Sequence, residues 1–198
     1  ILYLESLEHD KNIERTIVTN FTLLDDDKLD FLLEHGVKLC TSLDGNEIIH
    51  NHNRPYKNGK GTYIDVVNRI KELKTKGLLF GAIQTTSNFA LDYPIEIIDQ
   101  YRELGFNTIF LRPLTPLGMA DKFWNEVGYD PEQFMLFYNK AFDYIMELNL
   151  KGEIFVEMHA TYFLKKILCN YSDNYMELRS PCGAGIGQMS YYYDGNVY

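Results

Sequence analysis

The clearest potential for chemistry lies in a hydroxyl and a carboxylate at Ser42 and Asp44, with Arg54 twelve positions after the serine. Ser42 ends a short apolar run, residues 37–42, and Gly45 follows the aspartate. A hydroxyl can hydrogen-bond a polar ligand, and a guanidinium binds a carboxylate through two parallel bonds. The alternative is a capping serine, an ordinary Asp-Gly turn and a surface arginine. On these residues alone, the alternative is slightly favoured.

A second candidate group consists of histidines. His50 and His52 have the His-x-His spacing of some metal-dependent hydrolases built on TIM barrels, which supports a rival enzyme hypothesis. They come several residues after the apolar run, where solvated loop histidines are commoner. Glu157 and His159 could be an acid or base, although on a helix they are more often a solvated or core-edge pair.

The elements that would position these residues alternate along the chain. Gly36, Gly77 and Gly105 mark the ends of three helical patterns. Short β-branched or apolar runs predict strands at 15–19, 37–42, 78–84 and 108–111, and apolar periodicity predicts helices at 25–35, 62–76, 94–104 and 131–148, with a long loop at 45–61 and helix favoured over strand at 153–168. Strands that alternate with helices indicate parallel β/α units with right-handed crossovers.

Each predicted strand ends in polar residues, and the carboxyl ends of parallel strands share one rim. These residues are Thr19 and Asn20, Ser42 and Asp44, Gln84 to Thr86, and Arg112. They predict a polar mouth above an apolar barrel or sheet, as in a TIM-type active site. The alternative is that they are loop residues that satisfy backbone groups. Four strands cannot close a barrel of eight, so we expect an open edge, with the missing strands before Ile1 or absent.

Composition narrows the class of protein. The chain has 198 residues, 45% of them hydrophobic and 24% charged, which is typical of one globular domain with a tail. The net charge of −9 argues against a nucleic-acid partner. Apolar runs are too short to span a bilayer and the start lacks the basic flank of a signal peptide, so we expect no membrane partner and a cytoplasmic location.

The composition changes after residue 170. Glycines surround Cys182, and the tyrosine-rich end contains Asp194-Gly195, which predicts a hairpin turn. We therefore expect two parts, a main domain at 1–170 and the start of an appended module at 171–198. The three cysteines, Cys40, Cys169 and Cys182, are widely spaced and odd in number, which favours reduced thiols or metal ligands over a disulfide framework.

Five stretches together resemble one known family: Thr19-Asn20, Ser42 to Gly45, Asn53-Arg54, Gly59 to Thr62, and Ser180 to Gly185. The sequence resembles the radical S-adenosylmethionine (radical SAM) enzymes that carry a SPASM-type extension. Within them it is most similar to peptide and protein maturases akin to the anaerobic sulfatase-maturating enzymes. The string at 179–188 is most similar to the maturase of the His-Xaa-Ser system.

This resemblance implies an α/β fold, the C-terminal portion of a partial, six-stranded (β/α) TIM-type barrel, followed by the start of a SPASM-like module. It implies an oxidoreductase that uses S-adenosylmethionine and [4Fe-4S] clusters to modify a peptide or protein substrate. The family's Cys-x3-Cys-x2-Cys cluster motif and Gly-Gly-Glu motif are not present in this sequence. We therefore expect the cluster ligands to lie mostly outside this chain, and the chain alone to be inactive.

The resemblance also assigns candidate binding residues. Ser42 and Arg54, with Asp44 beside them, would hold polar groups of S-adenosylmethionine, and Leu111 and Arg112 occupy the strand end that passes near the adenine. Cys182 would be a ligand of an auxiliary iron-sulfur cluster, since small neighbours allow the close backbone approach that a cluster needs. The rival hypotheses are a metal-dependent TIM-barrel hydrolase that uses the two histidines and a non-catalytic peptide-binding module.

Overall fold

The structure, a computed structural model, describes residues 1–6, 13–169, 171, 182–185, 187–192 and 194–197. The chain divides into two compact units, residues 1–156 and residues 157–198. The first unit contains the sheet and the helices that cover it. Among the described residues, no helix is both long and apolar enough to cross a bilayer.

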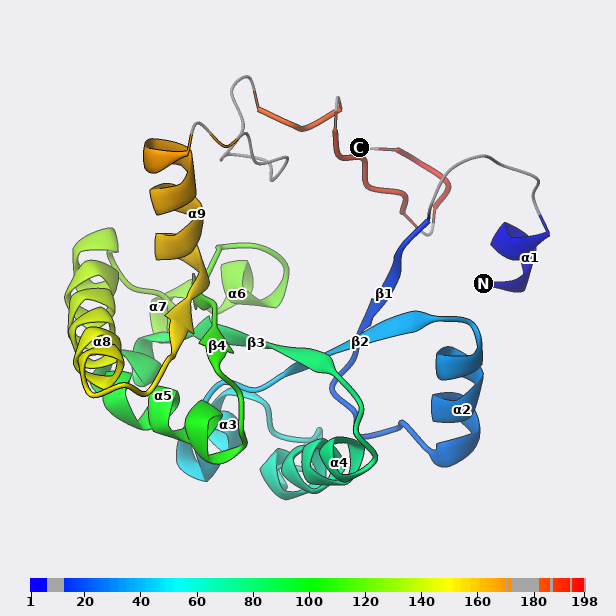
Figure 1. Cartoon of the computed structure of the whole chain (residues 1–198), viewed down its shortest axis with the longest axis horizontal. Helices are drawn as coiled ribbons and strands as arrows, with labels where there is room; N and C mark the ends of the chain where they lie inside the picture. Colours follow the sequence, from blue (N-terminus) through cyan, green and yellow to red (C-terminus); the bar gives the residue numbers. More distant parts are fainter. Residues whose placement is uncertain (7–12, 170, 172–181, 186, 193, 198) are drawn as a thin grey trace. The chain divides into compact units, whose positions relative to one another are not determined.

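A four-stranded parallel sheet forms the centre of the first unit (Figure 1). Its order is β1 (Arg15–Val18), β2 (Val37–Ser42), β3 (Phe80–Thr86) and β5 (Leu111–Pro113). The strand β1 lies at one edge, as the sequence predicted for an open sheet. The α/β class with parallel strands is confirmed.

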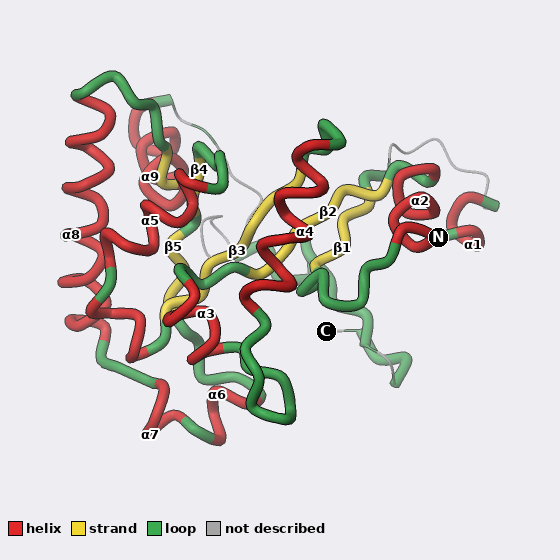
Figure 2. Tube along the Cα trace, turned by 90° about the horizontal axis from the view of Figure 1, so that it is seen from below, coloured by secondary structure: helices red, strands yellow, loops and turns green. Residues whose placement is uncertain are grey.

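The helices between the strands are α2 (Asp26–Glu34), α4 (Tyr63–Thr75), α5 (Pro94–Glu103) and α8 (Pro131–Leu150). Shorter elements are α1 (Leu2–Glu5), α3 (Glu47–Asn53), the 3-10 helix η1 (Asn88–Asp92), β4 (Thr108–Ile109), α6 (Met119–Lys122), α7 (Trp124–Val127), β6 (Val156–Glu157) and α9 (Met158–Leu168). Figures 1 and 2 show α3 and α4 on the same side of the sheet.

The two faces of the sheet differ in character, because successive side chains of a strand point to opposite faces. One face is covered by helices and carries the buried side chains of Leu39 and Thr41 in β2 and of Gln84 and Thr86 in β3. The other face carries Ser42 and, in the neighbouring strands, Val18, Gly81 and Arg112. These three neighbours are exposed to solvent.

The core lies between the sheet and the helices. The apolar residues whose periodicity predicts α4 are Val66, Val67, Ile70 and Leu73, and all four are buried. Helix α5 adds Ile97, Ile98 and Tyr101, and α8 adds Phe137, Ala141, Ile145 and Leu148 at helical spacing. Burial of such side chains supplies most of the stability of a domain of this size, at roughly 25 cal/mol per Å² of apolar area.

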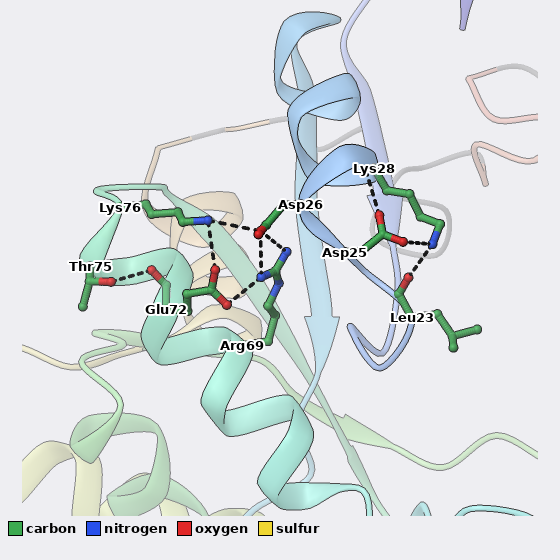
Figure 3. Close-up of polar contacts among 8 residues, drawn as sticks. All are labelled: Leu23, Asp25, Asp26, Lys28, Arg69, Glu72, Thr75 and Lys76. Atoms are coloured by element: carbon green, nitrogen blue, oxygen red, sulfur yellow. Dashed lines mark hydrogen bonds and ion pairs between the residues drawn. The ribbon is translucent and has the colours of Figure 1, made fainter.

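Helices α2 and α4 are joined by a cluster of charges on the surface (Figure 3). Asp26 in α2 binds Arg69 (3.2 Å) and Lys76 (3.3 Å), and Glu72 binds the same two cations from within α4. Asp26 is 68% exposed, so solvent screens these pairs and each contributes little to stability. The cluster links the two helices at the surface.

Four of the predicted boundaries were wrong. Residues 45–61, expected to be a loop, contain α3, which begins after Asn46 accepts a hydrogen bond from the Ile49 amide (3.2 Å). The third strand begins at residue 80, because the Leu78 amide still bonds to the end of α4 at Leu73 (3.1 Å). Residues 108–111 divide into β4 and the first residue of β5. The helix favoured at 153–168 is confirmed as α9, but it begins only at residue 158, after the two-residue strand β6.

The tyrosine-rich end fits the predicted turn. Tyr191 and Val197 form an antiparallel bridge, and the Gly195 amide donates to the Tyr192 carbonyl (3.0 Å). Residues 193 and 198 lie outside the described residues, as do 172–181 and 186, which include part of the glycine-rich string at 179–188. The expected division at residues 170 and 171 stays a prediction.

Tyr101 offers a test of how the helices hold the end of β2. Its hydroxyl is fully buried and donates to the Leu43 carbonyl (2.8 Å). We expect Tyr101→Phe to lower the free energy of unfolding by about 1 to 2 kcal/mol, because the buried carbonyl loses a donor. Urea denaturation measures this, with Tyr56→Phe at the surface as the control. An equal effect of both substitutions would contradict a special role of Tyr101.

Candidate functional site

Asp44 lies two residues after β2 and is the centre of the site. Its side chain is only 2% exposed, and its carboxylate accepts four hydrogen bonds, two on each oxygen. Arg54 donates through Nε to Oδ2 (2.7 Å) and through Nη2 to Oδ1 (3.1 Å). The Asn53 amide donates to Oδ2 and the Thr85 backbone amide to Oδ1, each at 3.2 Å. Every acceptor site of this buried charge is therefore used, as burial of a charge requires.

A second connection between Asp44 and Arg54 runs through His50. The Asp44 amide donates to His50 Nδ1 (3.3 Å), His50 Nε2 lies 3.2 Å from Thr62 Oγ1, and that hydroxyl donates to the Arg54 carbonyl (2.6 Å). Since Nδ1 accepts, the proton of the neutral ring lies on Nε2 and is donated to Thr62. The polar stretch after β2 thus folds back on itself.

Burial lowers the pKa of His50 to about 4; the negative charge of Asp44 opposes this shift and the positive charge of Arg54 adds to it. The imidazole is neutral at physiological pH, which is the form that can accept from the Asp44 amide. A protonated ring would lose that acceptor and would place a second cation beside Arg54.

Asn53 links this pair to the end of β3. Its Oδ1 accepts a hydrogen bond from the Ser87 hydroxyl (2.7 Å) while its amide nitrogen donates to Asp44. Beyond β3, the Tyr129 hydroxyl donates to the Thr86 carbonyl (2.9 Å) and accepts from the Leu114 amide (2.7 Å). These contacts tie the segment after β5 to the end of β3.

A cavity of about 340 Å³, here called the rim cavity, opens beside the pair of Asp44 and Arg54. Its volume lies at the lower end of the range for small-molecule sites. One side is polar and comes from the ends of β2, α3 and β3; the other is mostly apolar and comes from the segment after β5. The polar side is formed by Asp44, His52, Asn53, Arg54, Thr85 and Ser87, and the other by Leu114, Met119, Ala120, Phe123, Glu126 and Val127.

The five candidate binding residues lie in three different settings. Arg54 lines the cavity with its side chain 34% exposed, and its Nη1 makes no hydrogen bond with another described residue. Ser42 and Arg112 share the other, uncovered face of the sheet, and their side chains have no described partner. Leu111 is fully buried and packs in the core.

The histidines of the rival hydrolase hypothesis are not brought together. They lie two positions apart on α3 and therefore point to different sides of the helix. His50 is buried between the Asp44 amide and the Thr62 hydroxyl, whereas His52 is exposed and stacks on Phe89 with ring centroids 3.9 Å apart. Among the described residues, no group of three His, Cys, Asp or Glu side chains could hold a metal ion.

The cysteines are separate from one another. Cys40 is half-buried, and burial raises the pKa of its thiol. Cys169 and Cys182 are free and exposed. Sequence reasoning did not assign Thr62, Ser87 or Tyr129 to the site. Two of them carried a signal: Thr62 ends the stretch Gly59 to Thr62 that resembles the family, and Ser87 directly follows the polar residues Gln84 to Thr86.

No family model matches the chain. The serine-type anaerobic sulfatase-maturating enzyme of Bacteroides thetaiotaomicron is 29% identical over 104 residues, which is 52% of this chain and 25% of the enzyme. That of Klebsiella aerogenes is 29% identical over 108 residues, 54% of this chain and 27% of the enzyme. An uncharacterized protein of Methanocaldococcus jannaschii is 32% identical over 105 residues, 53% of this chain and 36% of that protein.

Solved structures of the maturating enzyme anSMEcpe have the same fold over most of the chain. The structure with bound AdoMet matches with a TM-score of 0.72 and 23% identity, over 83% of this chain and 45% of the enzyme. The structure that also contains the Kp18Cys peptide matches with a TM-score of 0.73, 23% identity and the same coverage. The chain is thus an α/β protein whose parallel sheet has the fold of part of a radical SAM enzyme. It is a distant homologue of the anaerobic sulfatase-maturating enzymes and aligns with about a quarter of the length of the two curated ones.

The pKa of His50 predicts a stability change with pH. Its folded value of about 4 lies below the ordinary 6.5, so the unfolded state takes up the proton first. The contribution of His50 is complete above pH 6.5 and falls as the pH decreases to about 4, by about 3 kcal/mol in total. We expect His50→Asn to lack this part of the pH dependence when unfolding free energies are compared at pH 7 and pH 4.

The matched control is His52→Asn, which removes an exposed imidazole from the same helix and should keep the full dependence. Proton NMR titration of the wild-type imidazoles gives a direct check. A His50 pKa near 6.5 would contradict the burial of a neutral His50 between Asp44 and Thr62.

Proposed function

We propose that this chain is the S-adenosylmethionine-binding portion of a radical SAM oxidoreductase that modifies a peptide or protein substrate. The observation that carries the proposal is the pair of Asp44 and Arg54 beside a cavity at the carboxyl end of β2, in a chain distantly homologous to sulfatase-maturating enzymes. In open α/β sheets, ligands bind beyond the carboxyl ends of the strands. The main part, residues 1–170, would be a portion of the partial β/α barrel, and 171–198 the start of a SPASM-like module.

The polar groups near this rim could supply hydrogen-bond donors to the polar groups of S-adenosylmethionine. Arg54 lines the cavity, Asp44 binds its Nε and Nη2, and Nη1 has no described partner and would be available for the ligand's carboxylate. Ser42 offers a hydroxyl and Arg112 a second cation on the uncovered face of the sheet. Leu111 contributes through packing under that strand end, since its side chain is buried. When bound, S-adenosylmethionine supplies the radical chemistry, and these residues orient it.

The [4Fe-4S] cluster does not fit the described residues of this chain. Its usual ligands are clustered cysteine thiolates, and Cys40, Cys169 and Cys182 lie on separate segments. We therefore propose that the activity requires a longer protein that contains this chain and supplies the cluster ligands. Free thiols fit the reducing cytoplasm that we propose as its location.

A peptide or protein is the proposed substrate. Solved structures of anSMEcpe contain the peptides Kp18Cys and Cp18Cys, which supports this class of substrate for a distant homologue. In this chain, the apolar half of the rim cavity offers Met119 and Phe123 to a peptide side chain.

The first test removes the guanidinium. We expect Arg54→Ala in the complete protein to weaken S-adenosylmethionine binding by about 1.5 to 3 kcal/mol, the scale of a charge-assisted hydrogen bond. The substitution also leaves a buried carboxylate without its cation, which lowers stability by about 3 to 5 kcal/mol. Calorimetry is therefore run at a temperature at which circular dichroism shows the variant to be folded.

Two matched variants sharpen that test. Arg54→Lys keeps the charge but loses the fork, and should bind with intermediate affinity. Lys57→Ala removes an exposed cation from the same loop and should bind as the wild type does. Unchanged affinity of folded Arg54→Ala would remove this arginine from the binding site.

A further test concerns Cys182, which we propose as an auxiliary cluster ligand. Its thiol is exposed, and the neighbouring Gly185 has a φ of +72°, a backbone conformation that favours glycine. We expect Cys182→Ala in the complete protein, reconstituted without oxygen, to contain less iron and sulfide than the wild type. Cys169→Ala is the control, since it removes another exposed thiol. Equal iron content in the wild type and Cys182→Ala would disprove the assignment.

A further inference from the structure

We infer that Ser87 and Asn53 form a latch that positions Arg54, so that its free guanidinium edge faces the rim cavity. The inference rests on the proposed function for the identity of the ligand, but the contacts that carry it lie within the chain. Ser87 bonds to Asn53 (2.7 Å), and Asn53 bonds to the same Asp44 oxygen that accepts from Arg54 Nε. The latch thus joins the end of β3 to the end of α3, across the end of β2.

The position of Ser87 indicates that its hydroxyl is used for the hydrogen bond to Asn53 rather than for a local cap. It lies at the N-cap of η1, where a serine side chain ordinarily accepts a hydrogen bond from the backbone of the helix. Here the side chain makes no capping bond and donates to Asn53 instead, in a setting that is only 7% exposed. Ser87 therefore lacks the local capping bond and instead contacts Asn53, which lies 34 residues away along the chain.

The charge of Asp44 fixes which way the Asn53 amide lies. If the amide were turned over, its oxygen would face the carboxylate oxygen and the two would repel each other. With the nitrogen toward Asp44, the amide oxygen faces Ser87, which must act as the donor. The hydrogen bond from Ser87 therefore stabilises the one amide orientation in which Asn53 supports the ion pair.

The latch positions Arg54 because this residue directly follows Asn53 and is the C-cap of α3. Consecutive side chains at 53 and 54 bind Oδ2 of Asp44, one through an amide and one through Nε. Two bonds hold the guanidinium plane against Asp44, Nη1 has no described partner, and the partly exposed side chain lines the cavity. A ligand carboxylate that meets a fixed edge loses less freedom on binding than one that must order a mobile arginine.

The binding experiment uses the complete protein and S-adenosylmethionine as the probe, with calorimetry of Ser87→Ala, Asn53→Ala and the double variant. We expect each single variant to bind about fivefold to tenfold more weakly, the scale of one hydrogen bond. If Ser87 acts through Asn53, its removal has no further effect in the Asn53→Ala background. Additive losses would show that Ser87 contacts the ligand directly, and would overturn the latch.

The control for loss of a hydroxyl is Thr75→Ala, which removes a hydrogen bond to the Glu72 carbonyl on the exposed part of α4. This variant should bind as the wild type does. Ser87→Thr retains a hydroxyl, and its affinity should return toward that of the wild type.

A second readout needs no ligand. In protein labelled with ¹⁵N-arginine, we expect the Nε proton of Arg54 to exchange with solvent faster in Ser87→Ala than in the wild type. Arg102, whose Nε bonds to Glu153 (2.6 Å) at the surface, is the internal reference and should not change. If Arg54 exchange is unchanged, the latch is wrong, whatever the binding result. If the wild type does not bind S-adenosylmethionine, the proposed function fails, and the exchange measurement alone decides on the latch.

Discussion

A buried carboxylate that needs four donors is the constraint on which the site depends. Removing the Asp44 charge from water is costly, and the cost is offset only when each oxygen is fully hydrogen-bonded. The donors come from α3, from the residue after it and from the backbone of β3. These segments must therefore meet at one place, and the chain between Asp44 and Arg54 must turn back on itself. The neutral His50, held between the Asp44 amide and Thr62, stabilises this turn from the other side.

The pair of Asp44 and Arg54 has a different role in the structure from the one that the sequence pattern suggests. Two parallel bonds from Arg54 were expected to go to a bound carboxylate, but Asp44 within the chain accepts two hydrogen bonds from the guanidinium. What remains for a ligand is one edge with a fixed direction. A fixed edge suits a site that must hold its ligand in one orientation, because the arginine is already ordered before binding. The buried ion pair thus contributes to orientation more than to net stability.

Much of the fold could be predicted from local patterns, whereas the site could be predicted only in part. The apolar positions of α4 repeat at helical spacing, and each of them is buried as predicted. Helix α3 was missed because it is short and polar, and its formation depends on the Asn46 cap and on burial of Ile49 and His50. These contacts could not be foreseen, since Thr85 bonds to Asp44 through its backbone and Ser87 bonds to Asn53 from far away in sequence. Periodicity reports which side of an element is apolar, and it carries no information on such distant hydrogen bonds.

The covered face of the sheet also determines what the uncovered face can present. Gln84 is fully buried on the helix side, where its Oε1 accepts from the Thr86 hydroxyl (3.1 Å) and from the Arg112 amide (3.3 Å). Arg112 extends its own side chain on the opposite face, in the same layer as Ser42. A buried amide on one side thus fixes the backbone that carries an exposed cation on the other. Because buried polar groups tolerate few arrangements, this contact holds β5 in register with β3. The polar rim can then vary in its exposed side chains while the buried hydrogen bonds keep its geometry.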